Sequence, residues 1–474
     1  MAARSKPDNL RAVHNGRIRR VLIMTLDKLL ILGAGPVGLA MANALKAHGI
    51  PYDQIDAKSG LGGNWHSGVY DGVHLNSSRK STEFGDYPMP EHYPDFPSAE
   101  QMKVYLEDFA QVKGIKDGIE YNKRVVRAVP KADDSWLVTF EDGEQRNYKG
   151  VVVCNGHHWD RRMPELPGEF TGELIHSKDY TGKAQLEGKR VLVIGAGNSA
   201  CDIACDSARF AKSADVSMRT GYWFLPRVVF GRPINDVPIW HLPVTVQRWI
   251  LRSIIWVTLG DFRKYGLEKP THRIFDRHTT FGAEMLHYMT LGRITPRRAI
   301  TAVAGNTITF SDGASADYDM IVAATGFNFR FPFLPDGLVE VKGDVVQLYG
   351  FAFPPNVKNL YIVGATQPRG GFGYLLTPAS DLYAKLIKMQ ENLEHPIGSI
   401  LEYMGEKIPK THLVDPGGAR REIMISNAVI KVVNWMGKRL QKKRPWQGMG
   451  ALIVPTNTEA PSPSAKAAVP EAAE

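Results

Sequence analysis

Two glycine-rich loops of the same kind, 162 residues apart, constrain the fold of this chain more than any other feature. The first spans residues 33–38 and reads Gly-x-Gly-x-x-Gly; the second spans residues 195–200 and reads Gly-x-Gly-x-x-Ala. Each loop follows a short apolar run and opens a segment with helical spacing, which is the beginning of a βαβ unit that binds a dinucleotide at its helix N-terminus. The sequence therefore predicts an α/β protein with two Rossmann-like domains.

Each glycine of the first loop has a separate steric role. Gly33 allows the tight turn, Gly35 lets the backbone approach a pyrophosphate, and Gly38 lets the helix pack closely on the strand. Asp56 ends the next predicted strand, 23 residues after Gly33, where a carboxylate accepts hydrogen bonds from ribose hydroxyls. We assign Gly33, Gly35, Pro36, Gly38 and Asp56 to the first dinucleotide.

The second loop differs in the residue that follows its βαβ unit. The acidic residue is missing there, and Arg219 stands in its place. A guanidinium pairs with a 2′-phosphate that a carboxylate would repel, so NADP(H) is favoured over NAD(H). Arg227 is a weaker second candidate for this role. The loop residues assigned to this dinucleotide are Gly195, Gly197, Asn198, Ser199 and Ala200.

Further apolar runs predict how the two domains are connected. Strands near 125–130 and 136–141, followed by one at 151–155, predict a β-meander that closes back onto the first sheet. Apolar segments at 319–327 and 360–365 predict a return to the first domain, so that the second domain is inserted in the first. The expected parts are a flexible basic N-terminal extension (1–27), the first domain (28–168 and 319–410), the linker and second domain with a helical insertion (169–318), a basic amphipathic C-terminal region (411–446) and a disordered tail (447–474).

The formal charge of +9 is concentrated near the two ends of the chain. Residues 1–28 carry a net charge of +5 and residues 419–444 carry +7, so that the body is close to neutral. This distribution argues against a nucleic-acid groove and allows peripheral contact of the ends with an anionic membrane surface. The apolar stretch Val244–Leu259 is interrupted by Arg248 and Arg252, which argues against a membrane-spanning helix.

The three cysteines indicate a reducing, cytoplasmic location, because an odd number in a long chain does not form a disulfide framework. Cys201 and Cys205 lie four residues apart, and a redox pair there would indicate a disulfide reductase. Such enzymes use tighter motifs, so we interpret the two as packed thiols. No metal site is predicted, because His157-His158 and the other histidines lack ligand spacing.

Beyond the two loops, the sequence resembles the flavin-containing monooxygenases, a dimethylaniline monooxygenase-like family of class B flavoprotein monooxygenases. The segment Phe170-Thr-Gly-Glu-Leu-Ile-His176-Ser-Lys-Asp-Tyr180 is similar to the family's fingerprint Phe-x-Gly-x-x-x-His-x-x-x-Tyr-(Lys/Pro). Other similar motifs are Gly62-Gly63-Asn64-Trp65, Phe84-Gly-Asp86-Tyr-Pro88, Phe96-Pro-Ser98, Tyr265-Gly-Leu267 and Ala324-Thr-Gly326-Phe327. Thr181 departs from the fingerprint, and Tyr180 stands where a Baeyer–Villiger monooxygenase would carry Trp.

The resemblance implies that FAD binds the first loop and NADPH the second, and that a C4a-(hydro)peroxyflavin oxygenates nitrogen or sulfur of a small apolar substrate with O2. It implies a catalytic role for Asn76, whose carboxamide donates hydrogen bonds without delivering a proton. It also implies FAD or nicotinamide contacts for Lys58, Gly63, Asn64, Trp65, Val125 and Gln367. His176 is expected to position the two domains and not to act as an acid or base.

Other functions stay open at this point. The same scaffold serves Baeyer–Villiger and decarboxylating keto-acid monooxygenases. An NADPH-dependent flavin reductase or oxidase would consume NADPH without an oxygenated product, and a nucleotide-sensing module would not reduce its flavin at all. Neither the substrate nor the oligomeric state follows from the sequence.

Overall fold

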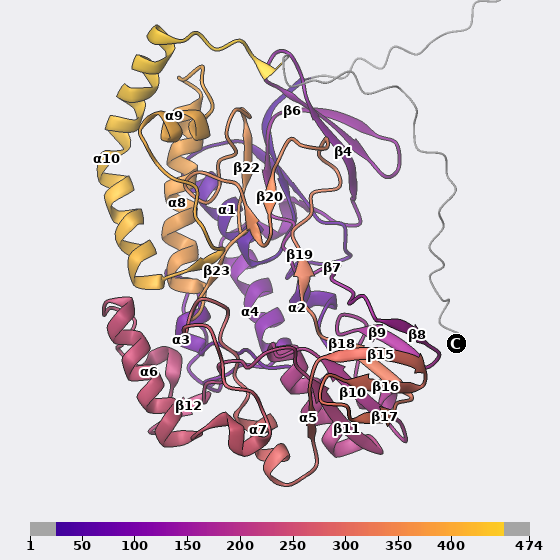
Figure 1. The fold of residues 1–474 in the computed structure, drawn as a ribbon. Helices are drawn as coiled ribbons and strands as arrows, with labels where there is room; N and C mark the ends of the chain where they lie inside the picture. Colours follow the sequence, from indigo (N-terminus) through magenta and orange to yellow (C-terminus); the bar gives the residue numbers. More distant parts are fainter. Residues whose placement is uncertain (1–24, 450–474) are drawn as a thin grey trace, which may run out of the picture.

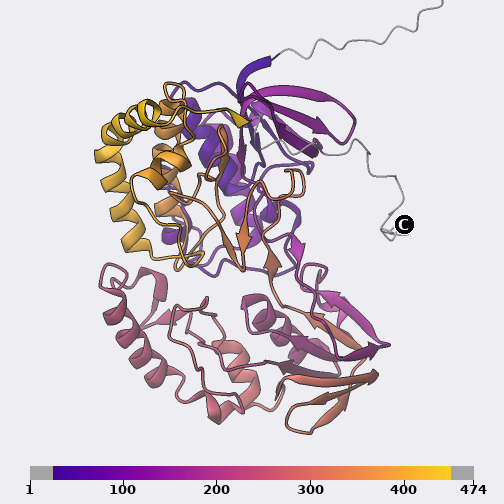
Figure 2. The ribbon, with the colours of Figure 1, turned by 45° about the horizontal axis from the view of Figure 1, so that its top comes forward.

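The computed structural model describes residues 25–449 of the chain, which form two α/β domains placed one above the other (Figures 1 and 2). The first domain is built on a seven-stranded sheet of order β3-β2-β1-β6-β5-β4, with β22 on the edge of β6. Its strands are β1 (Thr25–Leu32), β2 (Tyr52–Ile55), β3 (Ile119–Glu120), β4 (Val125–Pro130), β5 (Trp136–Phe140), β6 (Gln145–Val153) and β22 (Leu360–Ile362). Strands β4, β5 and β6 are antiparallel neighbours, which confirms the predicted β-meander.

Helices cover the first sheet and bury its apolar side chains. They are α1 (Pro36–Ala47), α2 (Asn64–Ser67), α3 (Arg79–Thr82), α4 (Ala99–Val112), α8 (Gly373–Gln390), α9 (Ile397–Tyr403) and α10 (Pro416–Lys443). Helix α1 begins with a proline, whose missing N–H is not needed there, and completely buries Leu39, Met41 and Leu45. Helices α8, α9 and α10 pack side by side on one flank of the domain (Figure 1). These helices hold the first sheet in place around the first glycine loop.

The second domain contains a five-stranded parallel sheet of order β14-β11-β10-β18-β9 and a four-stranded sheet of order β17-β16-β15-β8. The strands are β8 (Gly168–Phe170), β9 (Glu173–His176), β10 (Arg190–Ile194), β11 (Ser213–Ser217), β14 (Thr295–Arg297), β15 (Ile300–Gly305), β16 (Thr307–Phe310), β17 (Ser315–Asp317) and β18 (Met320–Ala323). Helices α5 (Asn198–Phe210) and α7 (Ala283–Thr290) pack against each other, and α5 also packs on β10 and β11. The predicted helical insertion lies between β11 and β14; it contains the hairpin β12 (Val228–Val229) and β13 (Arg232–Pro233) and the helix α6 (Val244–Thr258).

The chain returns to the first domain later than the predicted position at residue 319. Strand β18 still belongs to the second sheet, where Met320 pairs with Val191 of β10 and with Glu173 of β9. All four residues of β18 are buried, and a continuous apolar run predicts a central strand without revealing its sheet. After β18 the chain crosses as β19 (Phe327–Asn328), which pairs antiparallel with β7 (Asp160–Arg161). These two segments form the connection between the domains.

Short elements complete the structure. They are β20 (Val341–Lys342), β21 (Val345–Val346), β23 (Gln367–Pro368), β24 (Leu413–Val414) and 3-10 turns at Lys116–Gly118, Lys183–Gln185, Ile234–Asp236 and Phe262–Tyr265. The tail predicted to be disordered starts at residue 447, but Met449 is buried and its N–H donates to Asp134 Oδ1 at 3.3 Å, so the prediction is wrong for residue 449. The rest of that tail and residues 1–24 of the predicted N-terminal extension lie outside the described residues.

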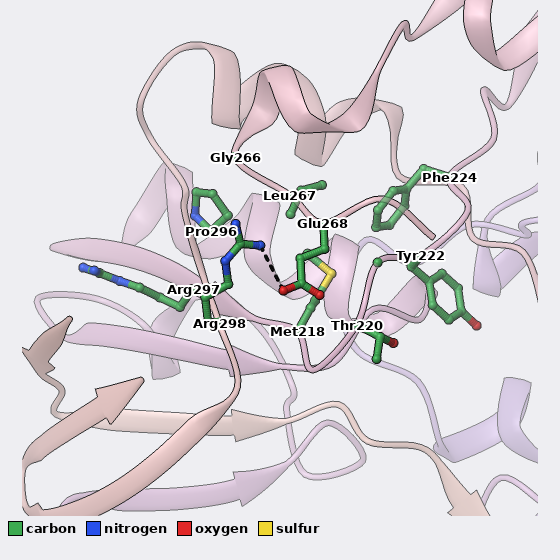
Figure 3. A pocket seen from close by; sticks show the side chains of 11 residues that line it. Met218, Thr220, Tyr222, Phe224, Gly266, Leu267, Glu268, Pro296, Arg297 and Arg298 are labelled. Atoms are coloured by element: carbon green, nitrogen blue, oxygen red, sulfur yellow. Dashed lines mark ion pairs between the residues drawn. The ribbon is translucent and has the colours of Figure 1, made fainter. Parts of the chain in front are cut away.

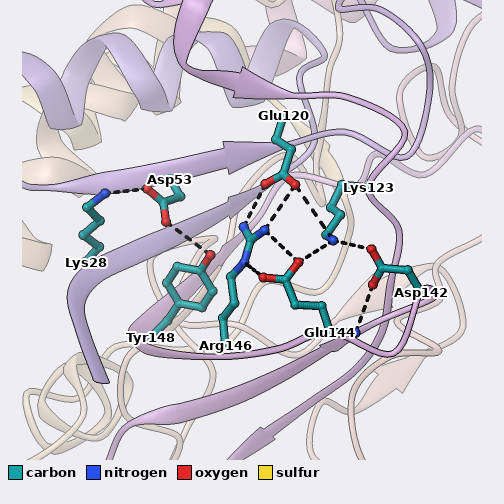
Figure 4. A network of polar contacts seen from close by, with 8 residues as sticks. All are labelled: Lys28, Asp53, Glu120, Lys123, Asp142, Glu144, Arg146 and Tyr148. Atoms are coloured by element: carbon teal, nitrogen blue, oxygen red, sulfur yellow. Dashed lines mark hydrogen bonds and ion pairs between the residues drawn. The ribbon is translucent and has the colours of Figure 1, made fainter. Parts of the chain in front are cut away.

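A charge network connects the meander to the parallel part of the first sheet (Figure 4). Arg146 on β6 donates to Glu120 at 2.7 Å and to Glu144 at 2.6 Å, and Lys123 donates to Glu144 at 2.6 Å and to Asp142 at 2.5 Å. Arg146 and Lys123 lower the pKa of Glu144 to about 2. The network therefore braces β3 and the turn before β4 against β6.

Candidate functional site

The first glycine loop has the close contacts that its sequence requires. Gly33 has φ +109°, and a Cβ on Gly38 would lie 2.0 Å from the Gly33 carbonyl oxygen. Gly35 is the N-cap of α1 and supplies no side chain to that helix end, so the first N–H groups of α1 remain available to an anion. Asp56 Oδ2 accepts from the N–H of Ala34 at 2.7 Å, which places this carboxylate directly beside the loop. The predicted residues of this loop thus form one cradle.

A second helix end approaches the same loop. The N–H of Gly62 donates to Ala34 O at 2.8 Å, and a Cβ on Gly63 would lie 3.1 Å from the Gly35 Cα. Gly63 is the N-cap of α2 and, like Gly35, provides no side-chain cap. The N-termini of α1 and α2 therefore converge, and this backbone cradle fits the pyrophosphate of FAD.

Lys178 in the interdomain linker contacts the candidate residue Asn64, and the sequence did not single it out. Its Nζ donates to Asn64 Oδ1 at 2.9 Å and to Gly68 O at 2.8 Å, which fastens the linker to α2. Burial lowers the pKa of Lys178, and the charges of Lys58 and Arg161 lower it further. Lys178 occupies a variable position of the fingerprint, so the motif contains no signal that would have singled it out.

The second glycine loop repeats the geometry of the first. Gly195 has φ +139°, and a Cβ there would lie 2.3 Å from Ala324 O. Gly197 is the N-cap of α5 without a side-chain cap, and a Cβ on it would meet no atom of the described residues within 4 Å. Ala200 is fully buried against the sheet, and Asn198 Oδ1 accepts from the N–H of Phe281 at 3.0 Å. The loop thus exposes backbone on the side that a pyrophosphate would approach, which fits NADPH.

Arg219, the residue predicted to contact the 2′-phosphate, is exposed and lies two residues after the end of β11. Its neighbour Thr220 accepts from Arg277 Nη1 at 3.3 Å, so a second guanidinium lies close by. A small cavity lies beside this strand end (Figure 3). In that cavity Arg298 lies 3.6 Å from Glu268, and Arg297 points away from the cavity, so neither of these two arginines offers a free positive charge to a phosphate there.

Asn76 contacts the second domain through Arg227. Arg227 Nη2 donates to Asn76 Oδ1 at 2.9 Å and lies 3.7 Å from Asp202 Oδ1 on α5. Arg227, the weaker candidate for the 2′-phosphate, is thus engaged with Asn76 and Asp202 instead. Sequence reasoning missed this contact because the two side chains are 151 residues apart.

Gln367 and four histidines lie where the C-terminal part of the first domain meets the interdomain region. The N–H of Gln367 donates to the carbonyl of His412 at 2.8 Å. Burial, with His412 as a second cause, lowers the pKa of both His157 and His278 to about 4, so both rings are neutral at pH 7. His158 contacts the ring of His157 at 4.1 Å. The spacing of these histidines in the sequence did not indicate that they meet.

The fingerprint residues serve the connection between the domains. The N–H of Lys178 donates to His176 Nδ1 at 3.1 Å, which leaves His176 Nε2 to donate to Gly326 O at 3.0 Å. Tyr180 is buried and its hydroxyl donates to Asp206 Oδ2 at 3.0 Å. His176 is completely committed to backbone contacts, in agreement with the expected positioning role.

The remaining candidates are the three cysteines, Val125 and Trp65. Cys154, Cys201 and Cys205 are buried free thiols, and burial raises their pKa values, which agrees with packed and unreactive cysteines. Val125 begins β4, and Trp65 is half-buried against the first core. Among residues 25–449, no helix has the length and apolar character needed to cross a membrane.

Comparison with known proteins agrees with this geometry. The flavin-binding monooxygenase-like family matches residues 27–396. Flavin-containing monooxygenase 5 of Mus musculus is 31% identical over 398 residues, which cover 76% of this chain and 73% of that protein. Solved structures that share the fold include S-allyl-L-cysteine S-oxygenase from Allium sativum (23% identity, TM-score 0.60, covering 88% of this chain and 93% of that one) and cyclohexanone monooxygenase (18% identity, TM-score 0.64, covering 86% and 98%). The chain therefore belongs to the flavin-binding monooxygenase-like family and is a flavin-dependent monooxygenase.

Proposed function

We propose that this enzyme oxygenates nitrogen or sulfur, a soft nucleophile, on a small apolar substrate with O2. The observation that carries the proposal is the setting of Asn76, whose carboxamide oxygen is held by Arg227 at 2.9 Å. The amide hydrogens are then the donors that Asn76 offers, and an amide does not give up a proton under these conditions. A donor of this kind stabilises developing negative charge on oxygen without protonating it.

Each of the two glycine-rich loops binds one dinucleotide in this proposal. The first loop with Asp56 and Lys58 holds FAD, and the second loop holds NADPH with Arg219 at the 2′-phosphate. Reduced FAD supplies the activation of O2, and the protein orients the reactants and excludes water. The further contacts we assign to the cofactors are those of Pro36, Gly63, Asn64, Trp65, Val125, Asn198, Ser199 and Gln367.

The test compares three classes of probe substrate with the purified holoenzyme under NADPH and O2: an amine or thioether, a cyclic ketone, and a keto acid. A tertiary amine or a thioether should give one N-oxide or sulfoxide for each NADPH consumed. An ester or lactone from a cyclic ketone would favour a Baeyer–Villiger enzyme, against which Tyr180 argues, and carbon dioxide from a keto acid would favour the decarboxylating type. Hydrogen peroxide equal to the NADPH consumed, with no product from any probe, would favour a flavin reductase or oxidase.

We also propose peripheral contact with an anionic membrane surface through α6 and α10. Trp249 and Trp256 on α6 are 70% and 75% exposed, and Trp435 on α10 is 57% exposed. The two helices meet at their N-terminal ends, where a Cβ on Gly417 of α10 would lie 2.6 Å from the carbonyl oxygen of Trp240, just before α6. Both lie on the same side of the molecule (Figure 1), and residues 419–444 add a net charge of +7. Exposed aromatic side chains beside basic residues are typical of interfacial helices.

Co-sedimentation with vesicles tests the contact. Binding should require phosphatidylserine, weaken with salt and fall in a Trp249→Ser, Trp256→Ser double variant. Val104→Ser on α4, where an exposed apolar side chain lies on another element, serves as the control. Equal sedimentation of the wild type and the double variant would contradict the proposal.

A further inference from the structure

Arg227 determines which end of the Asn76 carboxamide faces the rest of the site. Its Nη2 lies 2.9 Å from Asn76 Oδ1. A guanidinium group has only hydrogen-bond donors, so the atom that faces it must be the amide oxygen. The orientation of this side chain is thus dictated by chemistry, and the amide nitrogen is directed away from Arg227.

Arg227 is itself held by the second domain. Its guanidinium lies 3.7 Å from Asp202 Oδ1, and its carbonyl accepts from the N–H of Ile234 at 3.0 Å. On the side of the first domain, the guanidinium lies 5.9 Å from the ring centroid of Phe96. Asp202 accepts from the Tyr70 hydroxyl at 2.8 Å. The charge of Arg227 and this hydrogen bond oppose the effect of burial, which raises the pKa of Asp202.

The chain of contacts leads from the second glycine loop to Asn76. Asp202 lies in the second turn of α5, the helix whose N-cap is Gly197. Tyr70 and Asn76 belong to the first domain, whereas Asp202 and Arg227 belong to the second. The contact of Arg227 with Asn76 therefore exists only while the two domains are docked in the arrangement described here.

We propose that Arg227 is a positioning residue that couples the docking of the NADPH domain to the orientation of Asn76. The proposal rests on the function assigned to Asn76 above. Without Arg227 the carboxamide is able to rotate, and its oxygen, an acceptor, would repel negative charge that the amide hydrogens otherwise stabilise. Loss of Arg227 should then have the same consequence for the reaction as loss of the Asn76 amide.

A double-mutant cycle on the holoenzyme tests this dependence. The variants are Arg227→Ala, Asn76→Ala and the double variant, assayed at saturating NADPH for hydrogen peroxide formed per oxygenated product. Each single variant should raise that ratio about tenfold, the effect of losing one hydrogen bond to a charged group. The double variant should raise it no further than Asn76→Ala alone. Multiplied effects in the double variant would show that Arg227 acts independently of Asn76 and would overturn the proposal.

Two further variants separate positioning from a general structural effect. Arg227→Lys keeps the charge but loses the planar fork, so it should give an intermediate ratio and retain FAD, even if Arg227→Ala folds poorly. Arg209→Ala is the matched control, because Arg209 pairs with Glu284 and Tyr288 within the second domain. A rise in the ratio in Arg209→Ala equal to that in Arg227→Ala would contradict a specific role.

Hydrogen–deuterium exchange of the NADP⁺-bound enzyme provides a measurement that does not depend on turnover. Arg227→Ala should accelerate amide exchange in residues 72–83, which contain Asn76, and Arg209→Ala should not. If exchange accelerates but Asn76→Ala stays fully coupled, the contact is supported and the catalytic role of Asn76 fails. Unchanged exchange in Arg227→Ala would refute the contact itself.

Discussion

Replacement of Gly197 by alanine should impair NADPH binding while leaving the fold intact. Replacement of Gly195 by alanine should instead destabilise the folded protein. Gly197 has no positive φ, and a Cβ on it would meet no atom of the described residues within 4 Å. The change in the free energy of unfolding should therefore stay within about 1 kcal/mol, because the lower entropy of the unfolded alanine chain offsets its poorer capping. Gly195 has φ +139° and a Cβ would lie 2.3 Å from Ala324 O, so Gly195→Ala should cost about 2–6 kcal/mol from backbone strain and overpacking.

The effect of Gly197→Ala on binding follows from the same open side of the loop. The new methyl group would stand where the pyrophosphate approaches the N–H groups of α5. Loss of one charge-assisted hydrogen bond corresponds to about a 10- to 100-fold rise in the KM for NADPH. FAD content should not change, because the first loop is untouched.

The assay combines steady-state kinetics with NADPH, the FAD absorbance of the purified protein and thermal unfolding. Gly118→Ala is the control, since Gly118 lacks a positive φ and a Cβ there meets no atom of the described part of the chain within 4 Å. A KM in Gly197→Ala within twofold of the wild type, with FAD bound, would refute the assignment of the second loop. If Gly197→Ala and Gly195→Ala unfolded at the same temperature, the expected difference in the space around these two glycines would be refuted.

Three further outcomes are expected. Arg219→Ala should raise the KM for NADPH about 10- to 100-fold and the KM for NADH less than about twofold, because NADH lacks the 2′-phosphate; equal effects on both would contradict the assignment. Asn76→Ala should retain FAD and convert NADPH consumption into release of hydrogen peroxide, measured with a peroxidase assay; unchanged coupling would exclude its role. Arg146 and Lys123 hold the folded-state pKa of Glu144 at about 2, below its ordinary 4.5, so this stabilisation is present above about pH 4.5 and is lost as the pH falls toward 2. Glu144→Gln should accordingly lower the free energy of unfolding at pH 7 by at most about 1 kcal/mol, since the carboxylate is 44% exposed. In unfolding titrations, the difference between the variant and the wild type should vanish near pH 2. A difference that grows in acid would contradict the lowered pKa of Glu144.

The nucleotide-binding loops could be predicted because their requirements are local. Gly33 and Gly195 need positive φ angles within a strand–turn–helix segment, and the residues next to them in the sequence identify that segment. The strand expected before the second loop and the helix expected after it were predicted for the same reason and are found as β10 and α5. Asp56 likewise lies at the end of the strand that pairs with β1.

The same local signals did not reveal the sheet to which a strand belongs. Residues 320–323 predict a buried strand, yet only pairing with β10 and β9 assigns them to the second domain. A β-strand has the same apolar pattern in either sheet, so its partners are determined by how the rest of the chain packs. The predicted boundary at 319 was wrong for this reason.

Sequence alone determined that this protein has two dinucleotide-binding domains, and its resemblance to the flavin-containing monooxygenases indicated a flavin- and NADPH-dependent enzyme. Only the tertiary structure decided that Arg227 faces Asn76, that Lys178 fastens the linker to α2, and that His157 and His278 stay neutral near His412. A backbone turn depends on residues a few positions apart, whereas the partner, burial and charge of a side chain depend on segments that meet only after both domains have folded and docked.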